Sequence, residues 1–361
     1  MDLTCKRKII VAPLNWGLGH ATRCIPIING LIKANYEPII ASDGNALLLL
    51  QKEFPNLKSL ELPSYNIKYS KSGKNLKFKL LLSVPTVIAA VKKEHKILAL
   101  FVKKENVSGI ISDNRFGAYN TTIPSVYLTH QLNVLSGNTT GITSKTHQKI
   151  IRNFDECWVP DFEGEHNYSG ELSHLEASDL PIKYIGILSR LQPIKCEIRN
   201  DLLVLLSGPE PQRTLLENNL LEALKNYSGK VLFVRGTLNN KIKLEVLNPS
   251  AGWAGNIEVI DYLLTSELEK AISESETVIA RSGYSTIMDL AFLGKKAFFI
   301  PTPGQFEQEY LAKLMKDKLI APFSNQQEFS LEKLTSLKDY KGFEVKEAIV
   351  DLKLFHLFEG E

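Results

Sequence analysis

Short apolar runs alternate with helix-length amphipathic segments along the first half of the chain. Runs of branched apolar residues predict strands at 8–13, 37–42, 57–62, 109–113, 124–129, 156–160 and 183–188. Apolar residues at three- and four-residue spacing predict helices at 20–35 and at 74–104, the second interrupted at Pro85. Because strands alternate with helices, we expect a parallel sheet with helices on both faces.

The same alternation restarts near residue 200. Strands are expected at 201–207, 230–236, 257–261, 277–280 and 297–301, and helices at 211–227, 268–275, 285–293 and 306–317. The stretch 189–200 has no hydrophobic periodicity and is predicted to be a linker. The fold class is therefore α/β, with two Rossmann-like, doubly wound domains at 1–190 and 191–340 and a helical segment at 341–361. Ligands of such sheets bind at the carboxyl ends of the strands, so we expect the site in a cleft that the two domains face.

Composition narrows the class of protein. The chain has 361 residues, 44% of them hydrophobic and 23% charged, which is typical of a globular protein of two domains. Lys and Arg number 43 against 40 Asp and Glu, a balance that argues against nucleic acid as a partner. The four cysteines form no C-x-x-C pair, no secretory signal is visible, and the apolar run 80–91 is short for a bilayer. We expect a cytoplasmic protein.

A glycine turn follows the first predicted strand, in the sequence N-W-G-L-G-H-A-T-R at 15–23. Gly17 and Gly19 permit a tight turn and close approach of a ligand, and the helix that begins there offers backbone N–H groups. A dinucleotide fingerprint requires a third glycine where this chain has Thr22, although Asp43 ends the second strand where such enzymes bind ribose. A nicotinamide oxidoreductase therefore stays open as an alternative.

His20 is the candidate catalytic base. It lies at the start of a helix beside the glycine turn, where the helix dipole favours a neutral imidazole that can accept a proton from a hydroxyl. The alternative is a capping or surface histidine. Asp113, at the end of another predicted strand, either orients His20, binds the acceptor, or is an ordinary turn residue. His130 is a rival base by the same positional reasoning.

Three polar loops follow strands of the second half. In R-S-G-Y-S-T-I-M-D at 281–289, hydroxyls and backbone N–H groups at a helix start suit phosphate oxygens, and a later carboxylate suits ribose. The alternative is a helix cap followed by a surface acid. The loop at 301–310 clusters amides and carboxylates suited to sugar hydroxyls, or else forms a solvated first turn. The third loop is at 206–210. The candidate ligand-binding residues of the three loops are Ser207, Gly208, Arg281, Ser282, Gly283, Tyr284, Ser285, Thr286, Asp289, Gln305, Glu307, Gln308 and Glu309.

The motifs G-L-G-H at 17–20 and R-S-G-Y-S-T-I-M-D…P-T-P-G-Q-F-E-Q-E-Y at 281–310 carry a family resemblance. The chain resembles the GT-B-fold glycosyltransferases, and among them the family of the bacterial lipid-linked N-acetylglucosaminyl transferase. The resemblance implies transfer of a sugar from a UDP-sugar, such as a UDP-N-acetylhexosamine, to a hydroxyl of a glycan or lipid-linked acceptor. It implies no cofactor besides the UDP-sugar co-substrate.

The resemblance also implies residue roles. Asp289 takes the place of the family's ribose-binding acid, usually Glu, and 282–286 hold the diphosphate. Gln308 and Glu309 read the donor sugar. Arg190 binds phosphate, 262–266 flank the uracil, and 345–358 cross back to the first domain.

Direct attack by the acceptor would invert the anomeric carbon. No D-x-D motif occurs in the chain, which favours a reaction without a metal ion. A nucleotide-sugar epimerase of the same fold and a non-catalytic nucleotide-sugar-binding protein remain alternatives.

Two further segments have two interpretations each. The segment 67–104 places ten lysines around an apolar stretch, which predicts contact with the inner face of a membrane or, alternatively, a core-facing helix with a solvated lysine side. The stretch 161–166 either binds a cation or forms a polar surface loop, and the loop is favoured.

Overall fold

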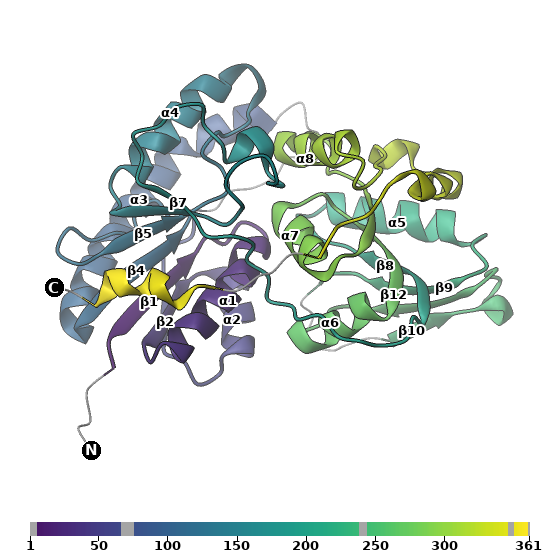
Figure 1. Ribbon diagram of the computed structural model, residues 1–361, viewed down its shortest axis with the longest axis horizontal. Coiled ribbons are helices and arrows are strands. Elements are labelled where there is room, and N and C mark those ends of the chain that lie inside the picture. The colour runs from purple at the N-terminus through teal and green to yellow at the C-terminus, as the bar shows by residue number, and fades with distance from the viewer. Residues whose placement is uncertain (1–5, 66–75, 238–243, 346–349, 360–361) are drawn as a thin grey trace. The chain divides into compact units, whose positions relative to one another are not determined.

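The computed structural model describes residues 6–65, 76–237, 244–345 and 350–359, and the chain divides into two units (Figure 1). Of the described residues, the first unit holds 6–65, 77–190 and 350–359, and the second holds Leu76 and the residues from Leu191 to Val345. The sequence analysis drew the domain border after residue 190 and set a C-terminal helical segment at 341–361. In the structure the described residues through Val345 belong to the second unit.

The first unit is built on a parallel sheet of seven strands in the order β3-β2-β1-β4-β5-β6-β7. The strands are β1 (Lys8–Pro13), β2 (Glu37–Ser42), β3 (Ser59–Glu61), β4 (Val107–Asp113), β5 (Ser125–Leu128), β6 (Glu156–Val159) and β7 (Ile182–Tyr184). Since β1 lies between β2 and β4, the order reverses at β1, which is where ligands bind in folds of this class.

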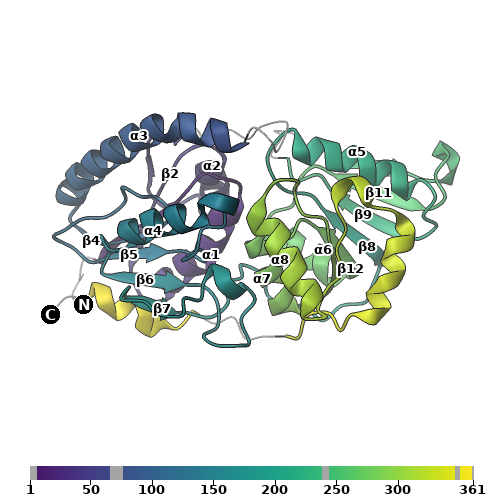
Figure 2. The ribbon, with the colours of Figure 1, turned by 90° about the horizontal axis from the view of Figure 1, so that it is seen from above.

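Helices cover both faces of this sheet. They are α1 (Gly19–Lys33), α2 (Gly44–Glu53), α3 (Leu76–Glu105) and α4 (Thr140–Ile151), with the 3-10 turns η2 (Gly137–Thr139) and η3 (Gly170–Leu172). Side chains alternate along each strand, so Ile10 and Ala12 of β1 pack with Leu98 and Val102 of α3 in one buried cluster. Figure 2 shows how far α3 runs along the first unit.

The C-terminal 3-10 helix η7 (Leu352–Phe358) packs on the first unit. The rings of Phe355 and Phe358 are buried, and their backbone oxygens accept hydrogen bonds from Tyr36 Oη at 2.9 Å and Arg7 Nη1 at 2.8 Å. A Cβ on Gly109 of β4 would lie 2.2 Å from Phe358, so a glycine is needed there for the ring to approach the strand.

The second unit has a six-stranded sheet in the order β10-β11-β9-β8-β12-β13. The strands are β8 (Asn200–Leu205), β9 (Lys230–Val234), β10 (Leu244–Leu247), β11 (Asn256–Ile260), β12 (Ser275–Ala280) and β13 (Lys296–Phe299). All neighbours are parallel except β10, which pairs antiparallel with β11. Parallel sheets with helices confirm the predicted two-domain Rossmann-like α/β class.

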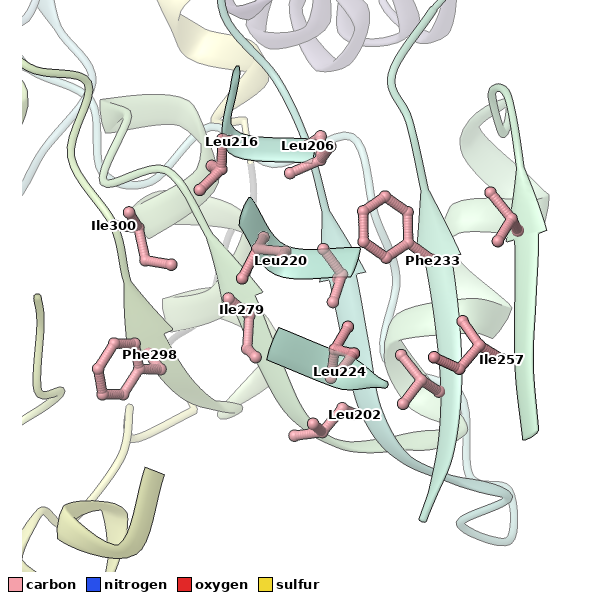
Figure 3. Packing of buried hydrophobic residues seen from close by; sticks show 13 residues of the cluster. Leu202, Leu206, Leu216, Leu220, Leu224, Phe233, Ile257, Ile279, Phe298 and Ile300 are labelled. Atoms are coloured by element: carbon pink, nitrogen blue, oxygen red, sulfur yellow. The ribbon is translucent and has the colours of Figure 1, made fainter. Parts of the chain in front are cut away.

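The core of the second unit forms where α5 lies over this sheet (Figure 3). Leu216, Leu220 and Leu224 of α5 recur at four-residue spacing and pack on strand residues such as Phe233 and Ile279. The helical elements of the unit are α5 (Gln212–Leu224), η4 (Pro249–Ala251), α6 (Thr265–Ser273), α7 (Tyr284–Leu293), α8 (Phe306–Asp317), η5 (Gln326–Glu328) and η6 (Leu331–Asp339).

Some elements differ from the sequence predictions. Pro85 does not interrupt the helix predicted at 74–104, since α3 runs through it with the Pro85 ring exposed. Helix α2 was missed because Leu47–Leu50 is an unbroken apolar run, and α4 because its sequence is mostly polar. Among the described helices none is long and apolar enough to cross a membrane.

Candidate functional site

The glycine turn lies at the carboxyl edge of the first sheet. Strand β1 pairs with β4 so that Pro13 lies beside Asp113, the last residue of β4. Gly17 adopts φ +80°, a left-handed conformation that favours glycine, and the chain then enters α1 at Gly19. Because β1 and β4 end side by side, the first turn of α1 meets the end of β4.

His20 and Asp113 form a hydrogen-bonded pair at this edge. His20 Nδ1 lies 2.8 Å from Asp113 Oδ1, with the His20 side chain 14% exposed and Asp113 fully buried. Arg23 follows His20 by three residues, so both side chains lie on the same face of α1. Its guanidinium binds both carboxylate oxygens of Asp113, through Nε to Oδ2 at 2.5 Å and through Nη2 to Oδ1.

This environment keeps Asp113 ionised. Burial by itself would raise the pKa of Asp113, but the charge of Arg23 and the contact with His20 outweigh burial and hold that pKa well below its usual range. An ionised carboxylate that accepts from Nδ1–H leaves the other ring nitrogen of His20 with its lone pair. Such an imidazole can take a proton from a hydroxyl.

The rival base, His130, lies two residues beyond the end of β5 and is 6% exposed. Its Nδ1 lies 2.6 Å from Nη1 of Arg23. Arg23 therefore contacts Asp113 and both candidate histidines. The sequence analysis missed Arg23, and the signal that marks it is its spacing of one helical turn from His20.

In the second unit, the three polar loops lie at one edge of the sheet. Strand β12 pairs with β8 and β13, so that Ala280 is beside both Leu205 and Phe299. The loops that follow these strands therefore meet. Gly208, with φ +102°, lies beside the loop at 301–310, where a Cβ on it would be in van der Waals contact with Thr302 Oγ1 at 3.8 Å. Ser207 and Gly208 are exposed.

Hydrogen bonds within this edge fix the loop at 301–305. Gln308 Oε1 accepts from the backbone N–H of Thr302, and Glu309 Oε1 accepts from that of Gly304, each at 2.8 Å. Ser282 Oγ donates to the backbone oxygen of Gln308 at 2.7 Å. Ser282 is fully buried, so its hydroxyl binds the protein, and a phosphate at this helix start would meet backbone N–H groups instead.

Arg281, a predicted contact of the nucleotide sugar, directs its guanidinium into the protein. The side chain is fully buried, and burial lowers its pKa to about 10. Its Nη1 donates to the backbone oxygens of Ile300 and Pro301, and its Nη2 to the backbone oxygen of Gln212 and to Oε1 of Gln326. Arg281 thus holds three segments together beneath the loops, because a guanidinium presents several donors in a fixed plane.

The remaining candidates lie at the surface of this edge or in the first unit. Gly283 is the N-cap of α7. Five candidates are half-buried: Ser285, Thr286 and Asp289 on the first turns of α7, and Gln305 and Glu307 around the start of α8. Tyr284 is buried. The predicted uracil-flanking stretch 262–266 follows β11, a parallel strand of the same sheet. Arg190 belongs to the first unit, where its Nη1 lies 3.6 Å from Glu53 Oε1.

The structure favours the loop interpretation of 161–166. Asp161 is fully buried, and its carboxylate accepts from the backbone N–H groups of Phe162, Tyr168 and Ser169. These hydrogen bonds occupy the carboxylate and hold the loop closed.

The sequence is similar to those of known glycosyltransferases. Residues 212–339 match the glycosyltransferase family 28 C-terminal domain. A UDP-N-acetylglucosamine–N-acetylmuramyl-(pentapeptide) pyrophosphoryl-undecaprenol N-acetylglucosamine transferase of Desulfitobacterium hafniense is 25% identical over 200 residues, which is 52% of this chain and 52% of that protein. The chain thus matches about half the length of this relative. The transferase of the same name from Rickettsia akari is 22% identical over 355 residues, or 91% of this chain and 88% of that protein.

Solved structures share the fold over most of the chain. The Acinetobacter baumannii MurG structure has a TM-score of 0.56 at 14% identity and covers 93% of this chain and 92% of that one. The spinosyn rhamnosyltransferase SpnG has a TM-score of 0.65 at 12% identity, covering 98% and 100%. With its two Rossmann-like units and its match to the family 28 C-terminal domain over 212–339, the chain is similar to the MurG-like glycosyltransferases and shares their GT-B fold.

Proposed function

We propose that the chain transfers an N-acetylhexosamine from its UDP-sugar to a hydroxyl of a lipid-linked acceptor, with inversion and without a metal ion. The observation that carries the proposal is the pair of His20 with an ionised Asp113 at the start of α1. The relatives named above are transferases of N-acetylglucosamine to a pyrophosphoryl-undecaprenol acceptor.

In the proposed reaction, His20 Nε2 takes the proton of the acceptor hydroxyl as its oxygen bonds to the anomeric carbon. The bond from that carbon to the diphosphate breaks, and UDP leaves with the electron pair. Attack from the face opposite the leaving group inverts the centre. Backbone N–H groups at the start of α7, after Gly283, would stabilise the charge on the diphosphate. Asp289, one turn further on, would bind ribose.

The lipid-linked acceptor is supported by the surface of α3. Val84 and Ile88 are 45% and 50% exposed and lie four residues apart, on the same side of the helix. Lys92 and Lys93 follow them and are also exposed. An apolar patch beside lysines suits an anionic lipid surface. Residues 67–75 of the predicted membrane segment 67–104 lie outside the described residues.

A transfer assay tests the proposal. UDP-N-acetyl-[14C]glucosamine is incubated with the protein and a polyprenyl-diphosphate-linked sugar, and label is followed into lipid. The proposal expects labelled lipid whose new bond has the opposite anomeric configuration, with a rate unchanged by EDTA. Conversion of the free donor to its epimer, binding without turnover, or a retained configuration would each contradict it.

Two variants separate the roles of the two units. His20→Ala should abolish transfer while calorimetry finds UDP affinity unchanged, because the base does not hold the donor. Asp289→Ala should instead weaken UDP binding about tenfold, the loss of one hydrogen bond to a charged group. Near-normal turnover of the first variant, or an unchanged UDP dissociation constant of the second, would refute that residue's role.

A further inference from the structure

Arg23 is a buried cation that the proposed reaction does not use directly. Its side chain is 3% exposed and contacts three titratable side chains at once. Besides its two contacts with Asp113, its Nη1 lies 2.6 Å from His130 Nδ1, and its Nη2 lies 2.8 Å from His20 Nδ1. The hydrogen positions on the two imidazoles follow from these contacts.

The contact with His130 has one consistent assignment. A guanidinium has donors and no acceptor, and it keeps its protons in proteins. His130 Nδ1 must therefore accept from Arg23, and a neutral imidazole that accepts at Nδ1 carries its hydrogen at Nε2. Both nitrogens of His130 are then committed, one as acceptor from Arg23 and one as donor. While this contact holds, His130 has no lone pair with which to take a proton from substrate.

For His20 the hydrogen position is the opposite of that in His130. His20 Nδ1 lies 2.8 Å from both Asp113 Oδ1 and Arg23 Nη2, and those two atoms are themselves hydrogen-bonded. Nη2 carries two hydrogens, so it can donate to the carboxylate and also reach the imidazole. A lone pair on Nδ1 would, however, lie 2.8 Å from an oxygen of the ionised carboxylate and be repelled by it, whereas an Nδ1–H donates to that oxygen. The ionised carboxylate is an acceptor only, so the hydrogen on His20 lies at Nδ1 and its Nε2 keeps the lone pair.

We propose that Arg23 is a positioning residue that gives two neighbouring histidines opposite hydrogen-bonding polarity, selecting His20 as the base and excluding His130. The inference rests on the proposed function only in naming the proton that His20 takes. Asn114 Nδ2 and Cys24 Sγ complete the surroundings of Asp113, at 3.1 Å from Oδ1 and 3.7 Å from Oδ2, and neither competes for an imidazole.

Nitrogen-15 NMR of the imidazoles tests this assignment without any substrate. In the wild-type chain at pH 7.5, long-range 1H–15N spectra should show His20 with hydrogen on Nδ1 and His130 with hydrogen on Nε2. The variants His20→Asn and His130→Asn assign the two signals by their disappearance. A His130 protonated at Nδ1, or a His20 whose only hydrogen is on Nε2, would overturn the proposal even if the chain proves to be a transferase.

Kinetics of Arg23→Lys supply the second test. An ammonium can pair with Asp113 but cannot span the carboxylate and His130 together. We expect kcat to fall at least tenfold, with the KM for the UDP-sugar within twofold of wild type, and the His130 signal to become a mixture of tautomers. Arg152→Lys is the matched control, because Arg152 makes an exposed ion pair with Asp179 in the same unit, and it should change neither quantity.

The outcomes of the two tests are separable. If Arg23→Lys keeps wild-type kcat, the positioning role is wrong. If the chain transfers no sugar to any acceptor, the proposed function fails, while the NMR spectra still decide the polarity of the two histidines.

Discussion

Replacing Asp113 with Asn removes one charge from a buried network and leaves the shape of the side chain nearly unchanged. Asp113 is fully buried, and its main partner Arg23 is 3% exposed. The variant leaves that guanidinium buried without a counter-charge, and breaking a buried pair in this way costs ~3–5 kcal/mol. Domains are stable by ~5–15 kcal/mol, so most of the variant should stay folded.

The turnover of Asp113→Asn should fall by more than its loss of folded protein explains. An amide at position 113 can donate a hydrogen bond to Nδ1 of His20 as well as accept one, so the imidazole no longer has to keep its hydrogen at Nδ1. Loss of a positioned base lowers the rate ~10²–10⁴-fold. The assay combines urea unfolding followed by circular dichroism with kcat measured per folded molecule.

Asp161→Asn is the matched control. Asp161 is as buried as Asp113 in the same unit, but its partners are backbone N–H groups and Ser169 rather than a cation and an imidazole. It should lose ~2–4 kcal/mol of stability, about the worth of one or two hydrogen bonds to a charged group, with turnover per folded molecule within twofold. Equal turnover of Asp113→Asn and Asp161→Asn would refute the reasoning.

The pH dependence of the stability difference between wild type and Asp113→Asn gives a further check. Because the pKa of Asp113 is lowered in the folded protein, its ionisation contributes stability above the pKa of the unfolded chain, which is about 3.9. That contribution is lost as the pH falls towards the folded pKa. The stability gap between wild type and Asp113→Asn should therefore be constant from pH 5 to 7 and shrink below about pH 4.

Burial lowers the pKa of His147 to about 4, so protonation of the unfolded chain should cost wild type about 3 kcal/mol of stability between pH 6.5 and 4. His147→Gln, which can keep the hydrogen bond to Tyr127, should flatten that slope in urea titrations at several pH values, and an unchanged slope would contradict it. Gly109→Ala should destabilise the first unit by ~1–3 kcal/mol through its clash with Phe358, measured by thermal unfolding. The cost should shrink in a Phe358→Ala background, and equal costs in both backgrounds would rule out the clash. Arg281→Met should lower the stability of the second unit by roughly 3 kcal/mol and weaken UDP binding together, because buried acceptors lose their donor. Weaker binding with unchanged unfolding would mean that Arg281 touches the nucleotide after all.

Local patterns predicted the elements well where periodicity was clear. The strands at 8–13 and 37–42 and the helix at 306–317 have the predicted bounds in β1, β2 and α8. Prediction failed at α2, where four consecutive leucines have no period, and at β10, a short antiparallel strand at the edge of its sheet. In both cases tertiary packing determines the conformation.

The candidate residues of the site were predicted from their positions after strands, because parallel strands gather their carboxyl ends at one edge. The structural role of Arg281 was not predictable in the same way. Its acceptors lie on Gln212, Ile300, Pro301 and Gln326, and nothing in the local motif distinguishes a guanidinium that faces a ligand from one buried under the loop.

The sequence by itself determined the order of strands and helices, the two-domain class and the ends of strands at which polar groups collect. These features can be predicted from the sequence because hydrophobic periods of two and 3.6 residues depend only on positions that are close together along the chain. Only the tertiary structure decided which of those groups meet. Asp113 lies 93 positions from His20 and His130 lies 107 positions from Arg23. Such pairs come together because β4 lies next to β1 in the sheet and β5 next to β4, an order that depends on long-range packing.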